Sequence, residues 1–303
     1  MDGVKAIFFD RCGRLRSGFQ LLLALALMIV LQVLPGFAAV FLQTEDSLWW
    51  VAVYLLATLA TVAAFGLLFR LLFKRQDTTS MDSFRVTGRG SAHLAAGMAF
   101  GAIAFSLAAL PMYISGHYVI SFNGVHPVLL AVTFALFIFV GFIEEITTRG
   151  AMQHALMRFG KWPSLLIISL IFGLLHMANP GVTVASIVGV SMAGLMLGLA
   201  MYATNSIAFS IGIHITWNWV QGAVYGIPVS GTVGEGSLFA TQFVGDNTLI
   251  TGGAFGTEAS LSCNIVLLLL CVALVVYGRK RGRFAVYDRD RQATRAAKQQ
   301  PRG

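Results

Sequence analysis

Long apolar stretches separated by short polar ones dominate the chain. A helix needs about 20 apolar residues to cross a bilayer. Runs of that length, or close to it, lie near residues 18–42, 48–73, 92–114, 127–148, 163–178, 182–203, 206–224 and 260–278. This pattern predicts an all-α polytopic membrane protein with about eight transmembrane helices.

The composition supports this prediction. The 303 residues are 57% hydrophobic and 11% charged, whereas soluble domains average about 25% charged residues. All 21 Lys and Arg residues fall in segments 1–17, 70–89, 149–161 and 279–303. Because positive residues collect on the cytoplasmic side, we expect both termini in the cytoplasm. The net charge of +8 then reflects topology and contact with the anionic lipid bilayer, and no nucleic-acid partner is expected.

The same segmentation divides the chain into three parts. Residues 1–17 form a cytoplasmic N-terminal segment, and residues 279–303 form a basic cytoplasmic tail. Between them, residues 18–278 form a single eight-helix membrane domain, with a core at 127–224 and an outer loop at 225–259. That loop is rich in Gly, Ser and Thr and lacks Lys and Arg.

Three polar groups interrupt apolar helices. They are Glu144-Glu145-xxx-Arg149, Phe172-xxx-His176 and His214-xxx-Asn218. Ionisable side chains at membrane depth are costly and usually face a protein interior or a water-filled cavity. We therefore expect the helices to surround a polar intramembrane cavity that opens toward the cytoplasm or sideways into lipid.

Helical spacing predicts contacts within and between these groups. Glu145 and Arg149 are four residues apart and share a helix face, so they can form an ion pair. His214 and Asn218 have the same spacing and can be hydrogen-bonding neighbours on one helix face. Glu144 and His176 each lie sixteen residues from Gly160, a predicted helix C-cap. In an antiparallel hairpin, they should meet.

Taken singly, each group could be a structural tie between helices. Together, two carboxylates, two histidines and an amide are hard to explain as packing. A carboxylate in such a cavity can act as a general base, and donors aimed at one point form an oxyanion hole. No His-Glu-xx-His or Gly-x-Ser-x-Gly motif occurs. Glu144, His176 and His214 are side chains of the kinds that bind a divalent metal such as zinc, so a metal site stays an alternative. Our favoured interpretation is a site without a cofactor.

The three motifs, in this order, resemble those of the CAAX-protease and bacteriocin-processing (CPBP or Abi) family of intramembrane proteases. The segment Thr251-Gly-Gly-Ala-Phe-Gly-Thr-Glu258 also resembles a loop of many bacterial members. The resemblance implies that Glu144 activates water with help from His176, and that His214 and Asn218 form the oxyanion hole. Glu145, Arg149 and Phe172 would support the site.

The resemblance also implies a function and a location. We expect a glutamate-dependent intramembrane endopeptidase acting on a membrane-embedded or lipid-anchored peptide or protein, in the inner membrane of a bacterium. One alternative is a non-catalytic immunity or regulatory partner of the same fold. Another is a proton-coupled transporter. The sequence does not set the oligomeric state.

Overall fold

The structure is a computed structural model that describes residues 18–19, 21–26, 56, 59, 60, 63, 67, 88–234 and 236–288. Most of the first two apolar runs, and most of the terminal segments, lie outside the described residues. The other six runs each form a helix.

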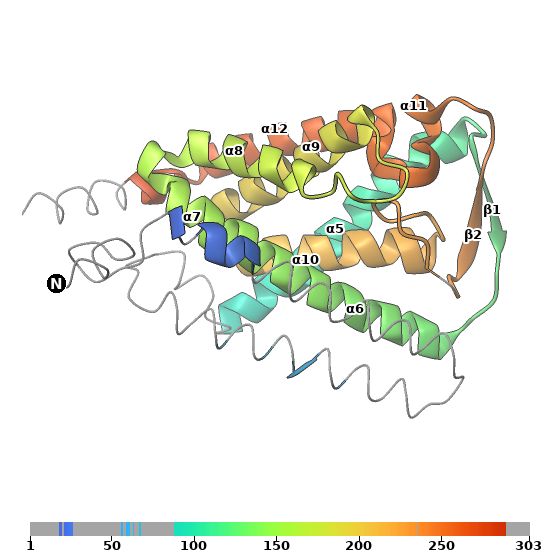
Figure 1. The fold of residues 1–303 in the computed structure, drawn as a ribbon, viewed down its shortest axis with the longest axis horizontal. Coiled ribbons are helices and arrows are strands. Elements are labelled where there is room, and N and C mark those ends of the chain that lie inside the picture. Colours follow the sequence, from blue (N-terminus) through green and yellow to red (C-terminus); the bar gives the residue numbers. More distant parts are fainter. Residues whose placement is uncertain are drawn as a thin grey trace, which may run out of the picture.

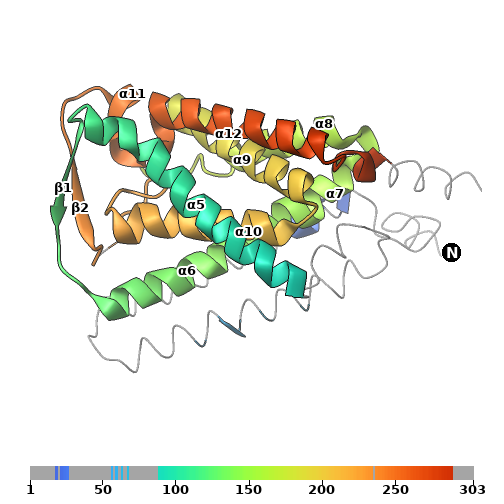
Figure 2. The same ribbon diagram turned by 180° about the vertical axis from the view of Figure 1, so that it is seen from behind.

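The described part is a helical bundle capped at one end by a β-ribbon (Figures 1 and 2). Its long helices are α5 (Gly88–Ile114), α6 (Pro127–Glu145), α8 (Lys161–Leu174), α9 (Val184–Thr204), α10 (Ile207–Trp219) and α12 (Leu261–Lys280). Short helical segments join or extend them: η1 (Ile146–Met152), α7 (Gln153–Leu156), η2 (Met157–Phe159), η3 (Val220–Val224), α11 (Thr248–Thr251), η4 (Gly253–Phe255) and η5 (Thr257–Ala259). The mostly helical architecture agrees with the sequence.

The predicted count of eight spans is not confirmed. Among the described residues, four helices are long and apolar enough to cross a membrane. They cover Gly90–Ile114, Pro127–Leu156, Val184–Thr204 and Leu261–Lys280, and Lys161–Leu174 is a shorter apolar helix.

Small residues allow the central helices to approach closely. A side chain at Gly97 of α5 would overlap the carbonyl oxygen of Phe209 in α10, and one at Gly212 of α10 would overlap that of Leu94. Gly194 of α9 lies against Phe172 of α8 in the same way. These glycines therefore serve packing within the chain: they bring α10, which carries the third motif, against α5, and α9 against α8, which carries Phe172.

The helix that begins at Pro127 continues past Arg149, as the sequence predicts. A π-helical segment, η1, contains Arg149, and π-segments often occur at functional sites. The helix ends at Gly160, whose φ of 112° favours glycine. From there α8 runs back along it, but it stops at Leu174, earlier than residue 178, so His176 lies in the turn after the helix.

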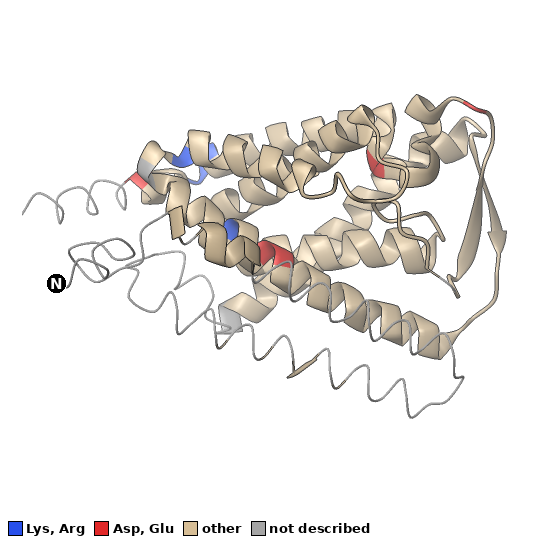
Figure 3. Ribbon diagram, in the orientation of Figure 1, with Lys and Arg blue, Asp and Glu red and all other residues tan. Residues whose placement is uncertain are grey.

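The opposite end of the bundle contains the ribbon and the loops. Strands β1 (Tyr118–Phe122) and β2 (Phe239–Phe243) pair antiparallel, with Tyr118 opposite Phe243. The sequence did not predict these strands. Most of the described Lys and Arg residues gather at the other end of the bundle, where α12 ends and α8 begins (Figure 3), while Arg149 is buried further along, in η1. The described part thus has one basic end and one end without Lys or Arg.

Candidate active site

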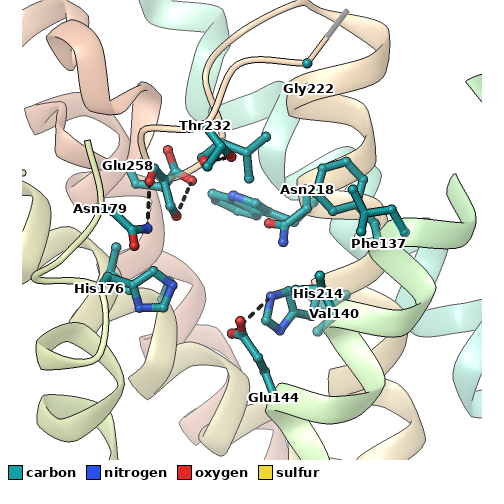
Figure 4. Close-up of a pocket in the computed structure, with 18 of the residues that line it drawn as sticks. Phe137, Val140, Glu144, His176, Asn179, His214, Asn218, Gly222, Thr232 and Glu258 are labelled. Atoms are coloured by element: carbon teal, nitrogen blue, oxygen red, sulfur yellow. Dashed lines mark hydrogen bonds and ion pairs between the residues drawn. The ribbon is translucent and has the colours of Figure 1, made fainter. Parts of the chain in front are cut away.

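A cavity of about 380 Å³ lies inside the bundle, between α6, α8, α9 and α10 and the loops at the ribbon end (Figure 4). It contains all four residues predicted to be catalytic, together with Phe172. Its polar lining residues include Glu144, His176, Asn179, His214, Asn218, Ser230, Thr232 and Glu258. Three separate sequence motifs therefore converge on one cavity.

Glu145 and Arg149 form a fully buried ion pair behind the cavity. Arg149 Nη1 donates to Glu145 Oε1 at 2.7 Å, and both side chains are 0% exposed. Arg149 Nη2 donates to the backbone oxygen of Gly194 at 3.0 Å, and the guanidinium lies 4.3 Å from the centre of the Phe172 ring. Arg149 thereby joins the α6 segment to α8 and α9.

His214 of α10 lies between the two adjacent glutamates. Its Nδ1 is 2.9 Å from Glu145 Oε1, and its Nε2 is 3.9 Å from Glu144 Oε2. An ionised carboxylate can only accept, so Nδ1 donates to Glu145 and Nε2 faces Glu144. Sequence reasoning missed this contact: Glu145 holds Arg149, as predicted, and it also orients His214.

His176 approaches the cavity from the other side. Its Nδ1 lies 2.8 Å from the backbone oxygen of Phe172, so Nδ1 donates and the neutral ring keeps an acceptor at Nε2. The centre of the Phe172 ring lies 5.1 Å from that of the His176 ring, at a tilted angle of 57°, and 6.0 Å from that of the His214 ring, edge-on at 83°. Phe172 thus packs between the two imidazoles.

The predicted meeting of Glu144 and His176 has a more open form in the structure. Both line the cavity, where Glu144 lies between His176 on one side and His214 on the other (Figure 4), and His214 Nε2 is 3.9 Å from Glu144 Oε2. Asn218 lies on the same side as His214, one helical turn further along α10. The site is therefore a partly open, largely apolar cavity whose polar lining includes acid, imidazole and amide groups.

The cavity lies toward one end of the bundle, and its expected opening toward the cytoplasm or sideways into lipid stays a prediction. Its far wall consists of residues from the loop segment 229–234 and of Glu258, across from Glu144 (Figure 4). Both belong to the segment that lacks Lys and Arg. The cavity therefore extends toward the ribbon end and away from the basic end.

Glu258 is the functional candidate that sequence reasoning did not place in the site. Its carboxylate is buried, accepts from Gln221 Nε2 at 2.6 Å, and lines the cavity. A sequence signal that could have identified it is the glycine-rich segment 251–258, which ends at Glu258. Gly252, Gly253 and Gly256 all have positive φ, so they shape the turn that directs Glu258 inward.

Metal-ligand geometry is not found in the described part of the chain. No group of three His, Cys, Asp or Glu side chains there could hold a metal ion. Glu144 and His214 are close, but His176 faces them across the cavity.

Apolar helices that enclose carboxylates and imidazoles define an integral membrane protein with the components of an acid–base site. Residues 126–220 match the protein-family model described as "Rce1-like: Type II CAAX prenyl endopeptidase Rce1-like". This match covers just under a third of the chain and confirms the resemblance over the segment that carries the three motifs. It supports a CAAX-type intramembrane protease. No curated protein and no solved structure matches the chain.

Proposed function

We propose that the protein is a metal-independent, glutamate-dependent intramembrane endopeptidase. It hydrolyses a peptide bond in a membrane-embedded or lipid-anchored substrate. The observation that carries this proposal is the different surroundings of the two adjacent glutamates. Glu145 is neutralised by Arg149, whereas Glu144 faces the cavity with two imidazoles and an amide.

Glu144 is the general base of the proposed reaction. It takes a proton from water, the water oxygen bonds to the substrate carbonyl carbon, and the proton is later given to the departing amine as the C–N bond breaks. His176 assists because its Nδ1 is occupied by the Phe172 carbonyl, so Nε2 can accept the second hydrogen of that water.

Asn218 and His214 stabilise the negative charge that develops on the carbonyl oxygen. The Asn218 amide can always donate. His214 donates from Nε2 only as an imidazolium, because Nδ1–H is already directed to Glu145. Donors fixed in a site without bulk water are worth more than donors in solution.

The test is turnover of lipid-anchored peptides by purified protein in liposomes, with products identified by mass spectrometry. Glu144→Gln should lower turnover by about 10²–10⁴, and Asn218→Ala by roughly 10²–10³. Asp246→Asn, which changes an exposed acid at the ribbon end, is the matched control and should leave turnover unchanged.

Two outcomes would overturn the proposal. Loss of turnover on adding a chelator, with recovery on adding a divalent metal, would establish a metal enzyme. Retention of the full cellular phenotype by both Glu144→Gln and His176→Ala would favour the regulatory-partner function.

A further inference from the structure

The wall of the cavity opposite Glu144 is a polar patch with one carboxylate. We call it the loop subsite and define it as Asn179, Ser230, Thr232 and Glu258. Asn179, Thr232 and Glu258 lie together in Figure 4. Asn179 Nδ2 donates to the backbone oxygen of Ser230 at 2.8 Å, which fixes the 229–234 segment beside Glu258. The loop subsite is therefore a built structure that joins three segments.

Glu258 is held firmly in this wall. Its side chain accepts from Gln221 Nε2 at 2.6 Å and from Ser230 Oγ at 3.4 Å, and the residue is 3% exposed. Gln221 Nε2 also donates to the backbone oxygen of Pro228 at 2.6 Å. These contacts fix the carboxylate in one orientation toward the cavity.

The partners of Glu258 are all neutral. No ion pair between Glu258 and a described Lys, Arg or His is found, whereas Glu145 has Arg149. The other titratable groups near it, Tyr118 and Cys263, are neutral in their protonated forms. Burial raises the pKa of the Glu258 carboxyl from 4.5 to about 7. Donors reduce the cost of burying an ionised carboxylate, and an opposite charge reduces it further.

We propose that the loop subsite binds a cationic group of the peptide substrate: a lysine or arginine side chain or a free N-terminal ammonium. The idea that the ligand is a peptide rests on the proposed function. The cavity volume of about 380 Å³ lies in the range of ligand pockets, roughly 300–1,000 Å³. The donors to Glu258 are the Gln221 amide, the Ser230 hydroxyl and the backbone N–H groups of Ser230 and Glu258, and none of them carries a charge that would offset the carboxylate. A cation bound there would leave another part of the peptide near Glu144.

The competing explanation is structural. Glu258 could simply tie η5 to η3 through Gln221. A structural tie needs an acceptor oxygen but no charge, so Glu258→Gln would preserve it. A cation subsite needs the charge. Charge selectivity therefore separates the two explanations.

The experiment measures binding to the Glu144→Gln protein, which should not cut its ligand. The probes are fluorescent palmitoylated Ala/Leu peptides in which one lysine is moved along the sequence, each matched by a norleucine peptide. At one or more positions the lysine peptide should bind about tenfold tighter. Adding Glu258→Gln should abolish this preference and leave norleucine binding unchanged. Adding Asp246→Asn instead controls for general charge attraction and should retain the preference.

A second measurement does not depend on a variant at Glu258. Carbodiimide modification of Glu258 in the Glu144→Gln protein, followed by mass spectrometry, should be reduced several-fold by the preferred lysine peptide and not by its norleucine match. The inference is overturned if lysine peptides bind no tighter at any position. It is also overturned if the preference survives Glu258→Gln, or if lysine peptides do not protect Glu258.

The two proposals fail separately. If the wild-type protein cuts no peptide but the lysine preference depends on Glu258, the peptidase function is wrong and the cation subsite stands. If peptides are cut with no charge preference, the subsite is wrong and the peptidase stands.

Discussion

The buried pair of Glu145 and Arg149 offers a quantitative test of how the site is held together. Glu145→Gln keeps the size of the side chain but removes its charge, so buried Arg149 loses its ion-pair partner and keeps only the attraction of Glu144. Removing one partner of a buried ion pair costs about 3–5 kcal/mol. Arg149 keeps its contacts with Gly194 and the Phe172 ring, so we expect the lower end, about 3 kcal/mol.

A double-mutant cycle with Arg149→Met measures the pair itself. Each single change strands one buried charge, whereas the double variant buries none, so its loss of stability should be smaller than the sum. We expect a coupling of about 2 kcal/mol, measured by equilibrium unfolding in detergent. The control is Asp288→Asn at the Lys161 pair, where Asp288 is 56% exposed and the cost should stay below about 1 kcal/mol.

The cycle also has a clear negative result. If the two single losses add within about 0.5 kcal/mol, Glu145 and Arg149 do not depend on each other and the reasoning fails. Turnover gives a further readout. Because Glu145 also orients His214, Glu145→Gln should lower turnover per folded molecule, which a purely structural role would not do.

Three further predictions concern packing, pH and topology. Gly97→Ala should destabilise the protein by about 1–3 kcal/mol, because its methyl group would overlap the Phe209 carbonyl, while Gly234→Ala, with open space around it, should be neutral. Glu258 ionises near pH 4.5 in the unfolded chain but near 7 in the folded protein, so stability should fall as pH rises across that window, by about 3 kcal/mol at pH 8. Glu258→Gln should lack this fall; an identical pH profile for both proteins in detergent melts would refute it. A cysteine introduced at position 82 should resist impermeant reagents added outside intact cells, since the basic segments are expected in the cytoplasm, and labelling there would reverse the topology.

Much of the fold followed from local pattern. Hydrophobic run length located the six long helices α5, α6, α8, α9, α10 and α12. Gly160 marked the turn between the first two motifs. The i,i+4 pairing of Glu145 with Arg149 survived the π-helical geometry of η1. Each of these features depends on residues close together in the sequence.

The missing parts depend on residues far apart in the sequence. The hairpin argument placed Glu144 and His176 at one level. It could not show that α8 ends at Leu174, nor that α10 packs on α6 so that His214 approaches both glutamates. Glu258 is still more distant in sequence. It reaches the cavity only because a turn with three positive-φ glycines folds back over the ribbon end.

The cavity therefore contains two carboxylates whose neighbours suit them to different tasks. Groups of one type can take different roles when their surroundings differ. Glu144 faces imidazoles, which can exchange protons with it through water, so it is suited to acid–base chemistry. Glu258 faces an amide and a hydroxyl, which can hold its orientation but supply no charge. A ligand cation would complete the surroundings of Glu258, whereas Glu144 already has the partners that general-base catalysis needs.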